Sequence, residues 1–269
     1  MTDVLESYRG RTAVVTGCSS GIGASVARLL IAAGAEVVGV DRVLPEYPLD
    51  RFLETDLGDL DSIEASAAQL PAEVHALFSC AAVSSGATDQ QTVLRVNFAG
   101  FREFLERAAE RIPAGGAVVS TASIAGRDWA DNLERITELV RTTSFAEAVA
   151  WAQQNEAYVV ERDAYRVAKE ALITYSVGRA FDLCEQGIRV NVLAPGVTDT
   201  PFLSHSIKVL GDAILRPPRP MGRLATADEQ AKILVFLNSD WASYLNGQVV
   251  WSDGGAVTRR ALGDLVSAE

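Results

Sequence analysis

The sequence predicts a doubly wound α/β fold, in which helices cover both faces of one parallel sheet. Short apolar runs alternate with amphipathic stretches from one end of the chain to the other, the pattern of parallel strands buried on both faces. A glycine-rich loop follows the first apolar run and opens the first amphipathic stretch. The chain has no internal repeat, low-complexity tract or interdomain linker, so we expect a single domain over residues 1–269.

The apolar runs predict a sheet of seven strands. Helices are expected to begin near Ile22, Leu60, Gln90, Asp163 and Ala227, where apolar residues take helical spacing after polar or acidic starts. Because right-handed crossovers join parallel strands, ligands are expected at the carboxyl ends of the strands. The predicted strands are residues 12–16, 37–40, 51–54, 77–80, 117–120, 189–193 and 248–251.

Composition and charge limit the partners of this chain. Its 269 residues are 48% hydrophobic and 22% charged, the make-up of a globule with a substantial core. The net charge of -11 argues against nucleic acid or an anionic membrane as the main partner. No signal-peptide pattern opens the chain, and no apolar run approaches the roughly 18 to 20 residues of a membrane span. We therefore expect a cytoplasmic protein that binds neither nucleic acid nor membrane.

The cysteines predict neither disulfides nor a metal site. Cys18, Cys80 and Cys184 are odd in number and far apart, and they form no CxxC motif and have no histidine nearby. This usage fits reduced thiols in a reducing compartment.

The glycine-rich loop indicates a dinucleotide site. Gly17, Gly21 and Gly23 follow a predicted strand and open a helix. The backbone there, with Ser20 and Ile22, can approach a pyrophosphate at the positive end of the helix. This context predicts a Rossmann fold, and the alternative interpretation is a tight turn without a ligand.

Acidic residues at the ends of two strands suit the rest of a dinucleotide. Asp41 follows the second strand, where a carboxylate can accept hydrogen bonds from both ribose hydroxyls and repel a 2′-phosphate. We therefore expect NAD, while the adjacent Arg42 partly neutralises that repulsion and leaves NADP as the alternative. Asp56 and Leu57 follow the third strand, where the carboxylate can accept the adenine amino group. Capping the next helix is an equally good role for Asp56.

Tyr165 and Lys169 are four residues apart on a predicted helix, so both side chains lie on one face. The ammonium is expected to lower the pKa of the phenol from its usual value of about 10, which makes the phenol usable as an acid or base near neutral pH. Alone, such a pair is weak evidence, because it also occurs on solvated helix faces. After a dinucleotide loop, it predicts hydride transfer.

The order of these motifs resembles the short-chain dehydrogenase/reductase family over nearly the whole chain. The resemblance implies a single-domain Rossmann fold and hydride exchange between a nicotinamide cofactor and an alcohol or ketone. The motifs that carry it are the loop at 16–23, Asp41, Asp56, Asn97, Ser123, Tyr165 with Lys169, Pro195 and Gly196 with Thr200, and the terminal Asp253, Gly254 and Gly255.

The resemblance also implies residue roles. Tyr165 is the implied general acid/base, and Ser123 is the hydroxyl that orients the substrate oxygen. Lys169 is the implied nicotinamide-ribose ligand, and Asn97 holds a water that relays the proton behind that lysine. The backbone of the segment after the sixth strand, with Thr200, is implied to contact the nicotinamide amide. Its expected cofactor residues are Pro195, Gly196, Val197, Thr198 and Thr200.

The chain departs from the family pattern after the fourth strand. Cys80, Ala81 and Ala82 stand where the family usually has Asn-Ala-Gly. The hydrogen bonds of that asparagine must be made otherwise, and cofactor contacts are expected from neighbouring backbone groups.

A second departure is an insertion before Tyr165, at about residues 127–157. It reads as two short helices, the second opened by a capping box from Ser144 to Glu147. A similar insertion occurs in the branch that contains bacterial 3α-hydroxysteroid dehydrogenase/carbonyl reductase, where it occupies the position of a four-helix subunit interface. The resemblance implies a homo-oligomer, with a dimer favoured and a tetramer as the alternative. A helical pair packed on its own subunit is a further alternative.

Residues 200–220 form another variable segment, which in this family commonly folds over the substrate. We expect a water-excluding lid over an apolar pocket, with an ordinary surface helix as the alternative. The apolar residues on which this rests are Phe202, Leu203, Ile207, Val209, Leu210, Ile214 and Leu215.

The expected substrate is an apolar cyclic or aromatic secondary alcohol, or its ketone. No cluster of arginines in the sequence indicates a phosphorylated or CoA-bearing substrate. The alternatives are an NADP-dependent carbonyl reductase and a non-catalytic NAD-binding sensor or scaffold. An enoyl reductase is disfavoured because that branch spaces tyrosine and lysine more widely.

Overall fold

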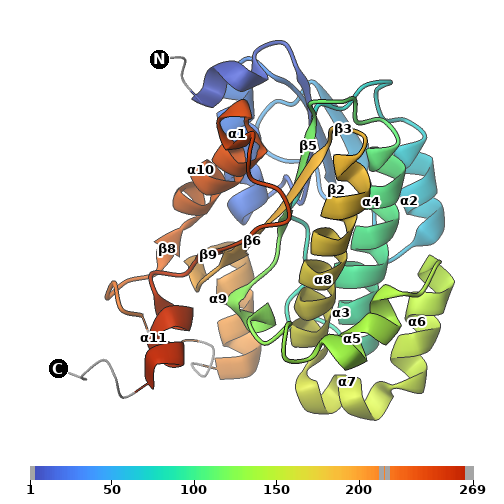
Figure 1. The fold of residues 1–269 in the computed structure, drawn as a ribbon, viewed down its shortest axis with the longest axis vertical. Coiled ribbons are helices and arrows are strands. Elements are labelled where there is room, and N and C mark those ends of the chain that lie inside the picture. The colour runs from blue at the N-terminus through green and yellow to red at the C-terminus, as the bar shows by residue number, and fades with distance from the viewer. Residues whose placement is uncertain (1–3, 212–214, 216–218, 264–269) are drawn as a thin grey trace.

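A seven-stranded parallel sheet forms the centre of the molecule, with strand order β3-β2-β1-β4-β5-β6-β9 (Figure 1). The structure is a computed structural model and describes residues 4–211, 215 and 219–263. All seven predicted strands are present, with bounds that differ from the predictions by at most two residues. They are β1 (Thr12–Thr16), β2 (Glu36–Asp41), β3 (Arg51–Glu54), β4 (Ala76–Ser79), β5 (Ala117–Thr121), β6 (Arg189–Pro195) and β9 (Val249–Ser252).

Helices cover both faces of the sheet, as predicted. Successive strand residues point to opposite faces, so Val14 and Val15 of β1 belong to two different cores. The Val15 core is covered by α1 (Gly21–Ala32) and α10 (Ala227–Asn238), with η1 (Val4–Tyr8) beside them. The Val14 core is covered by α2 (Leu60–Ala67), α4 (Phe101–Ala109) and α8 (Ala164–Cys184).

The order of strands reverses between β1 and β4, which creates a crevice at their carboxyl ends. The helix after β4 borders this crevice and changes its winding along its length. It begins as α3 (Gln90–Leu94), widens into the π-helical turn η2 (Arg95–Gly100), and continues as α4.

The insertion before Tyr165 forms three helices, whereas we expected two. They are α5 (Leu133–Val140), α6 (Phe145–Gln154) and α7 (Glu156–Arg162), and Asn155 alone separates the last two. Ile136, Trp151 and Val159 are buried in the Val14 core, and the three helices lie beside α3 and α8 (Figure 1). The apolar face of the insertion is therefore largely covered by its own subunit.

The remaining elements lie at the carboxyl edge of the sheet. The segment after β6 forms β7 (Thr198–Asp199) and then α9 (Pro201–Leu210), and β7 pairs with β8 (Ala225–Thr226). Helix α11 (Ala256–Leu262) follows β9. The expected lid residue Ile214 lies outside the described residues. No helix in the described ranges is long and apolar enough to cross a bilayer.

Candidate functional site

A cavity of about 870 Å³ occupies the crevice at the carboxyl ends of the strands. It is lined by every predicted site residue except Asn97. The predicted residues that line it are Gly17, Ser20, Gly21, Ile22, Gly23, Asp41, Arg42, Asp56, Leu57, Cys80, Ala81, Ala82, Ser123, Tyr165, Lys169, Pro195, Gly196, Val197, Thr198 and Thr200.

The glycine loop brings three backbone segments into close contact. Gly17 has φ +71°, and a Cβ there would lie 2.7 Å from the Ala81 Cα. A Cβ on Gly23 would lie 2.2 Å from the Gly17 carbonyl oxygen. Side chains are thus excluded where the loop meets α1 and β4. The bare backbone at this helix start fits a pyrophosphate.

Asp41 accepts hydrogen bonds from four donors, two of which belong to Ser19 of the glycine loop. Its Oδ2 accepts hydrogen bonds from the Ser19 N–H at 3.0 Å and the Ser19 hydroxyl at 2.6 Å. Its Oδ1 accepts from the N–H groups of Arg42 at 2.7 Å and Val43 at 3.3 Å. To bind Asp41, a ribose hydroxyl would have to replace the Ser19 hydroxyl as a hydrogen-bond donor to the carboxylate. Ser19 was not among the site residues predicted from the sequence.

The Asp56 carboxylate lines the cavity and does not cap α2. Its Oδ1 accepts a hydrogen bond from the Gly58 N–H at 2.7 Å. The cap is Asp59, whose side chain accepts from the Asp61 N–H at 3.0 Å. The alternative role of Asp56 as a helix cap is therefore wrong.

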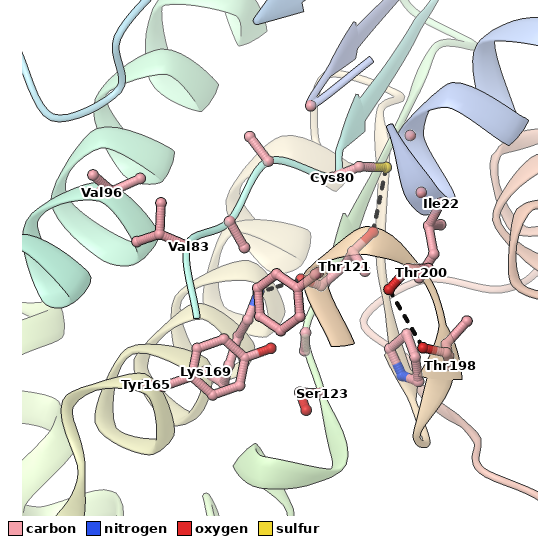
Figure 2. Close-up of a pocket in the computed structure, with 18 of the residues that line it drawn as sticks. Ile22, Cys80, Val83, Val96, Thr121, Ser123, Tyr165, Lys169, Thr198 and Thr200 are labelled. Carbon is pink, nitrogen blue, oxygen red and sulfur yellow. Dashed lines mark hydrogen bonds between the residues drawn. The ribbon is translucent and has the colours of Figure 1, made fainter. Parts of the chain in front are cut away.

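Thr16 and Thr121 form hydrogen bonds where the usual asparagine is replaced by Cys80. The Thr16 hydroxyl accepts the N–H groups of Cys80 at 3.1 Å and Ala81 at 3.2 Å, and so joins β1 to the end of β4. The Thr121 hydroxyl lies 3.4 Å from the Cys80 sulfur (Figure 2). Burial raises the pKa of the Cys80 thiol to about 11, so the thiol stays protonated at neutral pH.

Tyr165, Lys169 and Ser123 come together at the cavity wall (Figure 2). Tyr165 and Lys169 lie one turn apart near the start of α8, and Ser123 lies beyond the end of β5. The Lys169 side chain is only 2% exposed, and its Nζ donates to the Thr121 carbonyl at 2.8 Å. The same Nζ lies 5.5 Å from the centre of the Tyr165 ring.

The expected lowering of the Tyr165 pKa is wrong for the protein in this state. Burial raises the pKa of Tyr165 to about 12, against a lowering contribution from the Ser123 hydroxyl and with a raising one from Asp163. Burial also lowers the pKa of Lys169 to about 8. Both groups are driven toward their neutral forms because desolvation is the largest effect on each.

The start of α8 is fixed by contacts from two other elements. Asp163 has φ 74° and ψ 118°, a conformation that residues other than glycine rarely adopt. Its Oδ1 accepts hydrogen bonds from the Tyr165 N–H at 2.8 Å and the Ser85 hydroxyl at 2.7 Å. The Gln90 side chain of α3 accepts the Ala164 N–H at 2.7 Å. These contacts set the position from which Tyr165 reaches the cavity.

Asn97 is buried in the π-helical turn, and its side chain bonds only backbone. Its Oδ1 accepts the Val83 N–H and its Nδ2 donates to the Val83 carbonyl, both at 2.8 Å. Both polar atoms of the side chain are therefore used to hold the loop after β4. A water behind Lys169 would need the Asn97 backbone carbonyl instead.

Helix α9, which begins the 200–220 segment, forms part of the cavity wall near Tyr165. Thr200 caps it by accepting the Leu203 N–H at 3.4 Å. Phe202 and Leu203 line the cavity, and the Phe202 ring centre is 5.7 Å from that of Tyr165. Val209 points outward and is exposed, so only one side of the helix faces the site.

Two arginines that sequence reasoning missed also line the cavity. Arg127 follows the turn after Ser123, and Arg166 follows Tyr165. Arg166 could have been suspected because it is next to the predicted site residue Tyr165. Nothing in the sequence pointed to Arg127. Among the residues with described positions, no group of histidine, cysteine, aspartate or glutamate side chains is arranged to hold a metal ion.

Two family models together match most of this chain. Residues 11–133 match the family model described as short chain dehydrogenase, and residues 133–257 match the model described as Enoyl-(Acyl carrier protein) reductase. The coniferyl-alcohol dehydrogenase of Pseudomonas sp. (strain HR199 / DSM 7063) is 36% identical over 244 residues, which cover 90% of this chain and 94% of that protein.

Two further similar proteins are hydroxysteroid dehydrogenases. The 3-alpha-hydroxysteroid dehydrogenase/carbonyl reductase of Comamonas testosteroni is 30% identical over 90% of this chain and 95% of that protein. The solved structure of the 3-alpha-hydroxysteroid dehydrogenase from Pseudomonas sp. B-0831, complexed with NADH, matches with a TM-score of 0.79 and 30% identity. That match covers 93% of this chain and 98% of the other.

Proposed function

Because this chain belongs to the short-chain dehydrogenase/reductase family of oxidoreductases, we propose that it interconverts an apolar cyclic or aromatic secondary alcohol and its ketone with NAD. The single observation that carries the proposal is the meeting of Ser123, Tyr165 and Lys169 at one wall of the dinucleotide cavity. A sensor or scaffold would need none of these three groups.

In ketone reduction, Tyr165 acts as the acid. Its high pKa keeps the phenol protonated, so it can donate its proton to the oxygen that becomes the alcohol. The Ser123 hydroxyl orients that oxygen beside the phenol. Lys169, a positive charge 5.5 Å from the ring centre, stabilises the phenolate that remains. In alcohol oxidation the phenolate is the base, and the same groups work in reverse.

The proton on Tyr165 is restored from solvent through Lys169. The ammonium already binds the Thr121 carbonyl, so its remaining N–H groups are available to a ribose hydroxyl and a water. We assign that water to the backbone carbonyl of Asn97, because both polar atoms of the Asn97 side chain are held by Val83. Asn97 is thus a positioning residue.

NAD is the proposed cofactor, and when bound it accepts or supplies the hydride. The loop at 17–23 would hold its pyrophosphate, Asp41 its adenosine ribose, and Thr198 and Thr200 the nicotinamide end. The NADH in the related hydroxysteroid dehydrogenase supports this choice. Arg42 also lines the cavity, which keeps NADP as the alternative.

The proposed substrate class is supported by the cavity wall and by the relatives. Phe202 and Leu203 of α9, with Val83 of the loop after β4, present an apolar surface beside Tyr165. The relatives are named for coniferyl alcohol, a primary alcohol that bears an aromatic ring, and for 3-alpha-hydroxysteroids, which are cyclic secondary alcohols. Both support a ring-bearing substrate, and the second supports a secondary alcohol. We also propose that the enzyme is a homodimer, because the insertion packs on its own α3 and α8 and so covers that side of the subunit.

The test is a titration with NADH and NADPH by fluorescence, followed by turnover of cyclic and aromatic secondary alcohols. Tighter binding of NADH, with turnover, is expected. The Tyr165→Phe variant should lose about 100- to 10,000-fold in kcat while its NADH affinity stays near wild type, because only positioned proton transfer is removed. Undiminished kcat in this variant would overturn the assignment of Tyr165, and tighter NADPH binding would overturn that of NAD.

A further inference from the structure

Two arginines line the cavity close to Ser123 and Tyr165, and a third arginine is near the first of them. Arg127 follows the turn after Ser123, Arg166 follows Tyr165 on α8, and Arg260 lies in α11. Arg127 and Arg166 line the cavity. Arg260 acts on Arg127 as a neighbouring positive charge.

The Arg127 guanidinium is held in place but is not fully used. Its Nη1 donates to the Ile124 carbonyl at 3.2 Å, which fixes its orientation. Its Nε is buried and has no hydrogen-bond partner among the described residues. The Asp128 carboxylate lies 3.6 Å from this Nε, which is longer than a hydrogen bond.

Asp128 is one carboxylate shared between two guanidinium groups. Its second oxygen lies 3.8 Å from Arg166, again beyond hydrogen-bond distance. Burial lowers the pKa of Arg127, with Asp128 opposing this and the positive charges of Arg260 and Arg166 adding to it. The cluster therefore carries an excess of positive charge in a chain whose net charge is -11.

Other carboxylates near the cluster are bound elsewhere. Glu170 accepts two hydrogen bonds from Arg162, at 2.6 and 3.1 Å. Asp163 lines the cavity, but its Oδ1 accepts the Tyr165 N–H and the Ser85 hydroxyl. Neither of them takes up the free N–H groups of Arg127.

We propose that Arg127 and Arg166 bind a carboxylate of the substrate, so that the natural substrate pair is a cyclic or aromatic hydroxy acid and its keto acid. This rests on the proposed function. A guanidinium can give two parallel hydrogen bonds to a carboxylate, and the guanidinium-bearing residues Arg127 and Arg166 both line the cavity that holds Ser123 and Tyr165. Ser123 and Tyr165 hold the reacting oxygen, so a carboxylate on Arg127 fixes the opposite end of the ring.

The experiment uses ketones that differ only in charge. Pairs such as 4-acetylbenzoate and 4-acetylbenzamide, or 4-oxocyclohexanecarboxylate and its carboxamide, are reduced with NADH by the wild type and by variants. The variants are Arg127→Gln, Arg166→Gln and, as a matched control, Arg141→Gln, which removes an exposed arginine of the insertion.

The wild type is expected to favour the carboxylate in kcat/KM by roughly 10- to 100-fold, the range for a charge-assisted hydrogen bond. Arg127→Gln should remove most of this preference for the carboxylate, and Arg166→Gln should remove part of it. Arg141→Gln should remove none, and its carboxamide reduction should stay near wild type. If the wild type reduces the carboxylate and the carboxamide with equal kcat/KM, or if Arg127→Gln keeps the preference for the carboxylate, the carboxylate site is overturned. The proposed function is left standing in either case.

Binding of benzoate, measured by calorimetry in the presence of NADH, separates the two proposals. If the wild type binds benzoate, loses this binding in Arg127→Gln and yet reduces no ketone, the carboxylate site is supported and the proposed function is overturned. Absence of benzoate binding to a protein that reduces neutral ketones would overturn the carboxylate site alone.

Discussion

Lys169 illustrates how one buried residue can set the working pH range of a site. It is enclosed by the end of β5 and by the Tyr165 ring, and its charge is stabilised by the Thr121 carbonyl. Burial lowers its pKa to about 8 and raises that of Tyr165 to about 12. Between pH 6 and 10 the lysine therefore changes charge while the phenol keeps its proton.

This difference predicts the pH dependence of ketone reduction. Lys169 is protonated below its pKa and neutral above it, so kcat/KM should be flat below about pH 7 and fall above about pH 8. Arginine does not lose its proton in this pH range, so the kcat/KM of Lys169→Arg should not fall above pH 8, however low its value is. A wild-type profile that stays level to pH 10 would contradict the assignment to Lys169.

Thr16 joins β1 to the end of β4 at the position where Cys80 replaces the usual asparagine. Its hydroxyl accepts two partly buried N–H groups, those of Cys80 and Ala81. Thr16→Val keeps the shape but leaves both donors without a partner, so unfolding by urea should show a loss of about 1–3 kcal/mol in stability. Thr16→Ser keeps the acceptor and should lose clearly less. Equal losses in the two variants would mean that the methyl group, not the hydroxyl, carries the effect.

At the scale of elements, Arg102 joins the insertion to the rest of the subunit. This arginine of α4 is buried, and its Nη1 donates to the Thr142 carbonyl at 2.5 Å and the Thr142 hydroxyl at 2.6 Å. Thr142 lies in the turn between α5 and α6. Burial lowers the pKa of Arg102, and its Nη2 has no partner among the residues that the structure describes.

Removal of the contact between Arg102 and Thr142 should destabilise the helices of the insertion more than the central sheet. Arg102→Met keeps an apolar stem but loses both hydrogen bonds, at a cost of about 2 kcal/mol, the scale for bonds to a charged group. Hydrogen–deuterium exchange should rise in residues 133–162 and change little in β1 and β5. Arg102→Lys retains a donor and should show a smaller rise. An insertion with unchanged protection in Arg102→Met would contradict this role.

The helices of the insertion also show where sequence reasoning stops. The strands were predictable because buried parallel strands are continuous apolar runs, as in β1 and β5. The break between α6 and α7 was not, since it occurs at Asn155 without glycine or proline. The dinucleotide loop and Tyr165 were found because their spacing is local in the chain. Arg127 was missed because only the tertiary fold brings it to Arg166.

At the scale of the whole molecule, large apolar side chains are exposed near the end of α10. Trp241 is 50% exposed and Tyr244 is fully exposed, and they lie on the segment between α10 and β9. Phe181 of α8 is 72% exposed, and the neighbouring Ala180 carbonyl accepts a hydrogen bond from Asn246 of that segment. Strand β9 is at the edge of the sheet and is only partly buried.

These exposed side chains predict which surface the proposed dimer uses. A variant with both Trp241→Glu and Tyr244→Glu should have the mass of one subunit by light scattering, because charges in an apolar interface oppose association. Val160→Glu, at a 56% exposed position on α7, is the matched control and should leave the dimer intact. Dissociation by Val160→Glu instead would assign the interface to the insertion, and a monomeric wild type would contradict the dimer.

The unusual backbone of Asp163 bears on how such a chain can change over evolution. The first turn of α8 is held from outside, by Ser85 and Gln90, and the left-handed φ of Asp163 turns the incoming chain sharply away. Ser85 and Gln90 belong to the loop after β4 and to α3, so they hold the start of α8 without using the helices of the insertion. Because the insertion also packs on α8, helices upstream can change in length without moving Tyr165 only where that packing is kept.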